Sequence, residues 1–156
     1  MLLLTVTPLG SQPRIDTLEI ERRIFEEVNR VRRAEGLEGL AWNERLAQEA
    51  RRHAQSMAAG KFFAHSDPVR GDLSERLNAS HIQWWNCSEN LFYERGHQDP
   101  VPIAVRNWLA SPGHRRNILD KVMTETGVGV AVEGSGSVFI VQQFIRPPDA
   151  PPKRSR

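Results

Sequence analysis

Three residues of this sequence have side chains that could form one chemical site: His65, Glu89 and His114. Two imidazoles and one carboxylate are the ligand set of an open zinc site, in which water takes the fourth position. Without a metal, the same side chains would form a structural polar cluster, with Glu89 accepting hydrogen bonds from imidazole N–H groups. Because the three are far apart in sequence, the residue types alone favour separate structural roles.

His114 lies in the first turn of a predicted helix. Ser111 is expected to cap this helix, and Pro112 suits its first position. His114 precedes Ile118 by four residues, so the two share an inward face. The positive end of the helix dipole disfavours an imidazolium there. We therefore expect a neutral imidazole, which can bind a metal, accept a proton or simply pack as a core histidine.

His65 and Glu89 lie in contrasting surroundings. Phe62 and Phe63 are expected to anchor the loop that carries His65, which would hold its side chain still. Glu89 has mostly apolar neighbours, and a carboxylate in such a place needs a partner to offset its desolvation. The serine next to His65, Ser66, is interpreted as a loop cap, as Ser111 is interpreted as a helix cap, and neither as a nucleophile.

Composition indicates one soluble domain. The chain has 156 residues, 39% hydrophobic and 26% charged, with a net charge of +2. Acidic and basic residues alternate along 19–35, which argues against a nucleic-acid-binding stripe. The single cysteine, Cys87, excludes an internal disulfide and a cysteine-rich metal site, and we interpret it as a small buried hydrophobic residue. His53 is interpreted as structural.

The two ends differ from the middle of the chain. Residues 1–15 are apolar at first and are expected to be a leader or a signal-peptide remnant, too short to span a membrane. Residues 147–156 are rich in proline and end in a basic run, so we predict a disordered tail. The folded domain is predicted to cover 16–146.

The order of elements predicts an α+β fold with helices on an antiparallel sheet. Helices are expected over residues 16–34, 43–59, 72–79 and 99–110, and from 111 onward. Strands are expected over 126–132 and 138–145 around a turn at 133–137, with a strand or an extended edge at 82–85 and a polar loop at 93–99.

Several short motifs in fixed order resemble one protein family. They are Phe63-Ala64-His65-Ser66, Ser88-Glu89-Asn90-Leu91, the run from Trp108 to Leu119, and Gly127-Val128-Gly129-Val130-Ala131. Together they resemble the CAP superfamily of cysteine-rich secretory proteins, antigen 5 and plant pathogenesis-related 1 proteins. The resemblance covers about residues 20–146 and is strongest to compact bacterial members without disulfides.

This resemblance implies a three-layer α-β-α sandwich with a central antiparallel sheet. It also implies a cleft lined by two histidines and two glutamates, which in some members holds a divalent cation such as zinc. His65, Glu89 and His114 match three of these positions, whereas the second glutamate falls at Ser111. The implied ligand set is therefore a His/Glu/His triad, with Ser111 and Ser66 lining the cleft.

The function implied by the family is a secreted or periplasmic binding module rather than an enzyme. Its partner would be a small molecule, lipid or peptide, with no nucleic acid, and the chain is expected to be a monomer. Zinc or another divalent cation is the only cofactor implied. Two alternatives remain: a hydrolase that uses zinc-activated water, and a binder of lipids or small hydrophobic molecules. The second would use Phe62, Phe63, Trp84 and Trp85, which are interpreted first as core residues.

Overall fold

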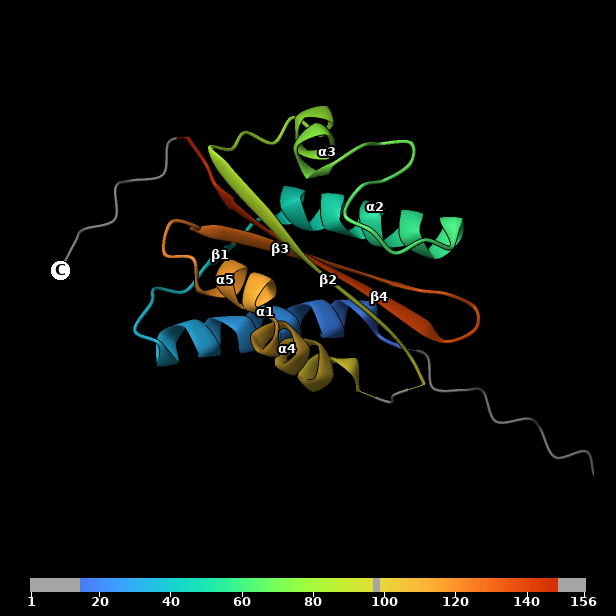
Figure 1. Ribbon diagram of the computed structural model, residues 1–156, viewed down its shortest axis with the longest axis horizontal. Helices are drawn as coiled ribbons and strands as arrows, with labels where there is room; N and C mark the ends of the chain where they lie inside the picture. Colours follow the sequence, from blue (N-terminus) through green and yellow to red (C-terminus); the bar gives the residue numbers. More distant parts are fainter. Residues whose placement is uncertain (1–14, 97–98, 149–156) are drawn as a thin grey trace, which may run out of the picture.

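The structure is a computed structural model that describes residues 15–96 and 99–148. Its elements are α1 (Thr17–Ala34), β1 (Ala41–Trp42), α2 (Glu44–Gly60), α3 (Leu73–Ala79), β2 (Asn86–Arg95), α4 (Pro100–Ala110), α5 (Pro112–Leu119), β3 (Glu125–Val132) and β4 (Ser137–Arg146). Figure 1 shows α2 and α3 on one face of the sheet and α1, α4 and α5 on the other. The predicted α+β sandwich is confirmed. The predicted leader and tail lie almost entirely outside the described residues.

The sheet has the strand order β1-β3-β4-β2. Both β2 and β3 pair with β4 in antiparallel fashion, so the three long strands agree with the predicted antiparallel sheet. The short strand β1 pairs with β3 in parallel and makes the sheet mixed. Periodicity could not reveal this strand, because Ala41 and Trp42 are its only residues.

Residues 82–85, predicted to be a strand or an extended edge, do not form a strand, and residues 93–95 of the predicted polar loop at 93–99 belong to one. The strand begins at Asn86 and continues to Arg95, so it contains Glu89. Residues 89–92 of this strand are all buried, because helices cover both faces of the sheet. Alternation of polar and apolar residues is lost in such a strand, which hid it from sequence analysis.

The layer of α1, α4 and α5 contains the largest apolar cluster. Ile20, Ile24 and Val28 of α1 are buried in it, as their spacing predicted, and they pack with Trp108 of α4 and Ile118 of α5. No helix within the described residues is both long enough and apolar enough to cross a membrane.

On the other face, α2 rests directly on the backbone of β3. A Cβ atom at Gly127 would lie 2.2 Å from the amide nitrogen of Ala47, and one at Gly129 would lie 2.0 Å from that of Arg51. Only glycine permits this approach at either position. The close contact fixes α2 against the sheet, and with it the buried side chains Glu49 and His53.

Candidate functional site

The candidate site lies where edge strand β2 meets both helical layers. Leu91 and Phe92 of this strand belong to apolar clusters on opposite faces of the sheet. Because side chains alternate along a strand, Glu89 faces the α2 and α3 layer with Leu91, and Asn90 faces the α5 layer with Phe92. Adjacent residues of β2 can therefore contact both layers.

Glu89 and His65 form the central pair that the sequence predicted. The Nδ1 atom of His65 lies 3.0 Å from Oε1 of Glu89. The carboxylate is buried, whereas the His65 side chain is 58% exposed. A carboxylate accepts a hydrogen bond, so Nδ1 of His65 is the donor in this contact and Nε2 is the ring nitrogen left for another partner.

Glu89 has two further partners inside the protein. The Nη2 atom of Arg76 lies 3.0 and 2.9 Å from its two oxygens, and Nε2 of Gln143 donates to Oε2 at 2.9 Å. Burial alone would raise the pKa of Glu89, but the hydrogen bond from His65 and the charge of Arg76 hold that pKa below its ordinary value. Glu89 is therefore a carboxylate at neutral pH.

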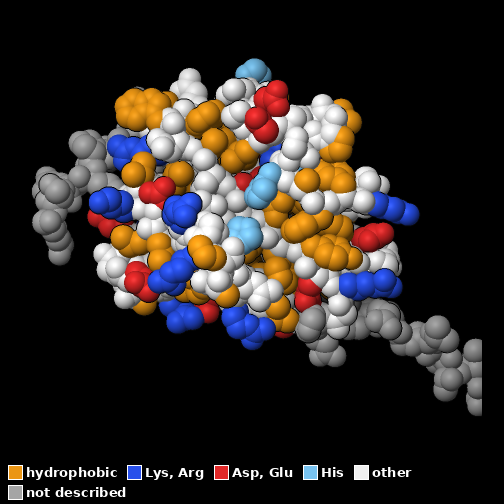
Figure 2. All heavy atoms as spheres, viewed as in Figure 1, with side chains coloured by type: hydrophobic (Ala, Val, Ile, Leu, Met, Phe, Trp, Pro, Cys, Tyr) orange, Lys and Arg blue, Asp and Glu red, His pale blue; other side chains and the backbone are white. Residues whose placement is uncertain are grey.

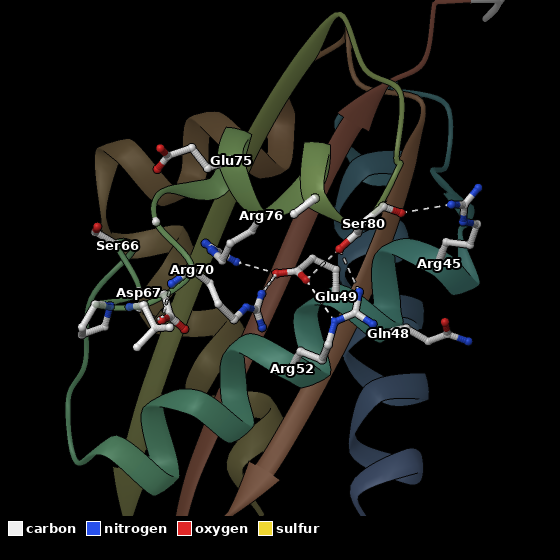
Figure 3. A pocket seen from close by; sticks show the side chains of 14 residues that line it. Arg45, Gln48, Glu49, Arg52, Ser66, Asp67, Arg70, Glu75, Arg76 and Ser80 are labelled. Atoms are coloured by element: carbon white, nitrogen blue, oxygen red, sulfur yellow. Dashed lines mark hydrogen bonds and ion pairs between the residues drawn. The ribbon is translucent and has the colours of Figure 1, made fainter.

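Arg76 is fully buried and joins the site to a second carboxylate. Its guanidinium donates to Glu49 at 3.1 Å and to the backbone carbonyl of His65 at 3.0 Å. Glu49 in turn accepts hydrogen bonds from Arg70 and Arg52 (Figure 3). Neither Arg76 nor Glu49 was predicted from the sequence, although Glu49 lies three residues after the buried Leu46 and so on the same helix face.

Two asparagines hold α5 and its histidine against β2. Asn90 donates to the backbone carbonyl of His114 at 3.2 Å. Asn117 donates to the carbonyl of Glu89 at 3.3 Å and to the side chain of Asn90 at 2.8 Å. The predicted cap is wrong in detail, because Ser111 occupies the N-cap position but its side chain makes no capping hydrogen bond.

His114 is half-buried, as expected for an inward position. Burial lowers its pKa, and the nearby His65 lowers that pKa further. The direction agrees with the predicted neutral imidazole. On the face of the molecule drawn in Figure 2, histidine side chains lie near the middle, next to hydrophobic side chains.

The donor set fits a divalent cation only in part. Both oxygens of Glu89 already accept protein hydrogen bonds, and the buried charge of Arg76 repels a cation at that carboxylate. Within 15–96 and 99–148, no group of three or more histidine, cysteine, aspartate or glutamate side chains is arranged to hold a metal ion. An imidazole is a suitable type of ligand for such an ion, and Glu89 fits the part of a carboxylate that orients His65.

Other residues singled out from the sequence have separate places. Ser66 is exposed and lines a pocket between α2 and α3. His53 is buried and donates through Nε2 to the carbonyl of Ala64 at 3.0 Å, in agreement with a structural role. Cys87 is half-buried, and burial raises the pKa of its thiol to about 11, so the thiol stays protonated.

The aromatic residues divide into two groups. Phe62 and Trp84 pack against apolar clusters, as expected. Phe63 and Trp85 are exposed, so their interpretation as core residues was wrong. The ring of Phe63 lies 6.0 Å from that of Tyr93, centroid to centroid. Phe63, two residues before His65 in the chain, therefore forms an exposed pair of aromatic rings with Tyr93.

Comparison with known proteins supports the resemblance. A model of the cysteine-rich secretory protein family, CAP, matches residues 25–144. Two proteins of Bacillus subtilis strain 168 are similar to the chain. The uncharacterized membrane protein YlbC is 34% identical over 126 residues, which cover 81% of this chain and 34% of YlbC. The uncharacterized protein YkwD is 35% identical over 125 residues, which cover 80% of this chain and 46% of YkwD.

A solved structure with the same fold is that of an extracellular protein containing a SCP domain from Bacillus anthracis strain Ames. It is 30% identical, with a TM-score of 0.74, and the match covers 87% of this chain and 45% of that protein. The chain thus spans less than half the length of each of these relatives. Because the family model and both curated relatives match most of its length, the chain belongs to the cysteine-rich secretory protein (CAP) family.

Proposed function

We propose that the chain is a binding module that acts outside the cytoplasm, with His65 and His114 as its ligand-facing groups. The observation that carries the proposal is the 3.0 Å contact between His65 and Glu89. A buried and ionised carboxylate here orients an imidazole that is itself open to solvent. Such a pair presents a histidine nitrogen outward at a fixed place, which is what a binding site needs.

A divalent cation such as zinc is the ligand that we assign to the two imidazoles. A carboxylate bonded to one ring nitrogen raises the basicity of the other, which strengthens a histidine as a metal ligand. The lowered pKa of His114 keeps its ring neutral and able to bind. When bound, the cation would supply a positive charge that attracts an oxygen atom of a further ligand.

The aromatic side chains support the same proposal for an organic ligand. Phe63 and Tyr93 are exposed, and Tyr93 also packs on the buried Phe139 at a centroid distance of 4.9 Å. A small molecule, lipid or peptide could place a polar group at His65 and an apolar part on these rings. Within the described residues, neither Ser66 nor Ser111 hydrogen-bonds to a histidine, so no contact there favours a nucleophilic hydrolase.

Calorimetric titration with Zn²⁺ tests the cation site. We expect saturable binding by the native chain, and at least about tenfold weaker binding by each of His65→Ala and His114→Ala, because each removes one of two ligands. His81→Asn is the matched control. His81 is an exposed histidine with φ of 53°, a conformation that asparagine tolerates. Failure of the native chain to bind Zn²⁺, or an equal loss in the control, would contradict the cation site.

The location is tested separately. The relative from Bacillus anthracis is described as extracellular, which supports the same place for this chain. Fractionation of the producing cells, followed by detection with an antibody, should find the full-length protein outside the cytoplasmic membrane or attached to its outer face. Its recovery from the cytoplasm alone would contradict this part of the proposal.

A further inference from the structure

The pocket that Ser66 lines lies between α2, α3 and the loop that joins them, and Arg76 is also part of its lining. Its volume is about 960 Å³. Figure 3 shows Glu49 near its centre, with arginine side chains pointing toward it from α2, the loop and α3. Four arginines line the pocket: Arg45, Arg52, Arg70 and Arg76.

The acidic side chains of this pocket differ in their hydrogen-bond donors. Asp67 accepts hydrogen bonds from the backbone amides of Val69 and Arg70, and Glu75 accepts one from the amide of Asp72. Each of these two carboxylates therefore accepts through one oxygen, Oδ1 of Asp67 and Oε2 of Glu75, from the turn in which it lies. Glu49 is the carboxylate that Arg52, Arg70 and Arg76 share, whereas Arg45 donates to the backbone carbonyls of Ser80 and His81.

Glu49 cannot saturate the guanidinium groups around it. Its Oε1 atom accepts from Arg70 and Arg76, and its Oε2 atom accepts from Arg52 at 3.3 Å and from the hydroxyl of Ser80 at 3.2 Å. One carboxylate offers about four acceptor sites, whereas each guanidinium carries five N–H donors. Arg52 and Arg70 keep 48% and 30% of their side chains exposed, so unused donors remain open to solvent.

We propose that this pocket binds the phosphoryl group of a small phosphorylated molecule, with Arg52 and Arg70 as the main ligands and Arg45 at the rim. Three oxygens of a phosphoryl group accept the N–H donors that Glu49 leaves unused, and the planar guanidinium matches them in pairs. A volume of about 960 Å³ exceeds what phosphate alone would fill, so the pocket has room for an organic part. The site is separate from the two imidazoles.

The test is a titration of the full chain with inorganic phosphate and with glycerol phosphate, followed by calorimetry or amide NMR shifts, at constant ionic strength set with chloride. We expect saturable binding that shifts amides of α2 and α3. Arg52→Gln, and the double variant Arg45→Gln with Arg52→Gln, should bind at least about tenfold more weakly, because exposed hydrogen bonds to an anion are lost. Arg70→Gln should show a similar loss.

Arg30→Gln is the matched control, because Arg30 is an exposed arginine whose carboxylate partner, Glu27, lies on the same helix. It should bind both probes like the native chain. Tighter binding of glycerol phosphate than of phosphate would support a phosphate ester, and equal affinities would support the phosphoryl group alone. The proposal would be overturned if neither probe bound saturably, or if chloride alone shifted the same amides as much as phosphate does. It would also be overturned if Arg30→Gln weakened phosphate binding as much as Arg52→Gln does. Thermal unfolding of each variant separates lost binding from lost folding.

Discussion

Arg76 connects two buried carboxylates that lie on different elements, with Nη2 2.9 Å from Oε2 of Glu89 and Nη1 3.1 Å from Oε1 of Glu49. The ion pairs join α2, α3 and β2 beneath the candidate site. Removing one partner from a buried charge pair is costly, because the other charge stays in a medium of low polarity.

Replacing Arg76 should therefore destabilise the fold. For Arg76→Met we expect a loss of about 3–5 kcal/mol in the free energy of unfolding, measured with urea. Adding Glu89→Gln to this variant should restore part of the loss, because the unpaired carboxylate is removed. Arg30→Met, at an exposed helix position, should change stability by less than about 1 kcal/mol. A loss for Arg76→Met no larger than this would show that the buried pairs contribute little.

Glu89 should matter to the cation site without being a ligand. In Glu89→Gln the charge behind His65 is lost while the shape is kept. We expect about 10–100-fold weaker Zn²⁺ binding, the usual effect of removing a carboxylate bonded to a histidine ligand. Calorimetry measures this loss, and near-ultraviolet circular dichroism checks the fold. Glu27→Gln, on the exposed face of α1, should leave the affinity unchanged. An unchanged affinity in Glu89→Gln would show that His65 binds without the support of the carboxylate.

The contact between α2 and β3 predicts a large effect of one methyl group. In Gly129→Ala the new Cβ would clash with the backbone of α2 at Arg51, so the helix must move away. We expect a loss of about 1–3 kcal/mol or more in the free energy of unfolding. Gly113→Ala adds the same group in α5, where nothing lies within 4 Å, and should be neutral or stabilising by up to about 1 kcal/mol. Equal effects of the two changes would refute the close approach.

Stability should fall as the pH drops below the ordinary pKa of histidine. Burial lowers the pKa of His53 from 6.5, and the charge of Arg76 lowers it further. Two carboxylates oppose this shift: Oε1 of Glu89 lies 3.9 Å from Nε2 of His53, and Oδ2 of Asp67 lies 3.8 Å from its Nδ1. The unfolded chain therefore takes up a proton at higher pH than the folded chain. The stabilisation is complete above about pH 6.5 and is lost as the pH falls through the lower, folded pKa.

Urea unfolding at several pH values measures this slope. His53→Gln should flatten it between neutral and mildly acidic pH, because the titrating group is gone. His81→Asn, at an exposed loop position, should keep the native slope. A native slope in His53→Gln would assign the acid sensitivity to other groups.

Much of the framework could be predicted, because most helices carry their own signals. The apolar stripe of α1 and the Asn43 cap of α2 are local features, and the structure has both. Strand β2 could not be predicted from local signals. Its inner residues are buried by two different layers, and Glu89 is satisfied by side chains from distant parts of the chain.

The candidate site shows the same division. The sequence led to His65, Glu89 and His114, and the structure brings His65 against Glu89. The sequence also predicted that Glu89 needs a partner to offset its desolvation, but it did not identify Arg76 as that partner. Arg76 shares a helix face with Leu73, three residues earlier, but a long arginine side chain at such a position can also reach solvent, so only the tertiary fold reveals that its guanidinium is buried.

The hydrogen bonds of Asn117 and Trp108 to β2 also affect whether this edge strand can pair with a strand of another molecule. Both residues donate to backbone carbonyls of this edge strand, Asn117 to Glu89 and Trp108 to Leu91, the latter at 2.9 Å. A carbonyl that already accepts a side chain is a poor template for a strand from another molecule. The same helices that carry His114 and its supports thereby protect the sheet from edge-to-edge aggregation.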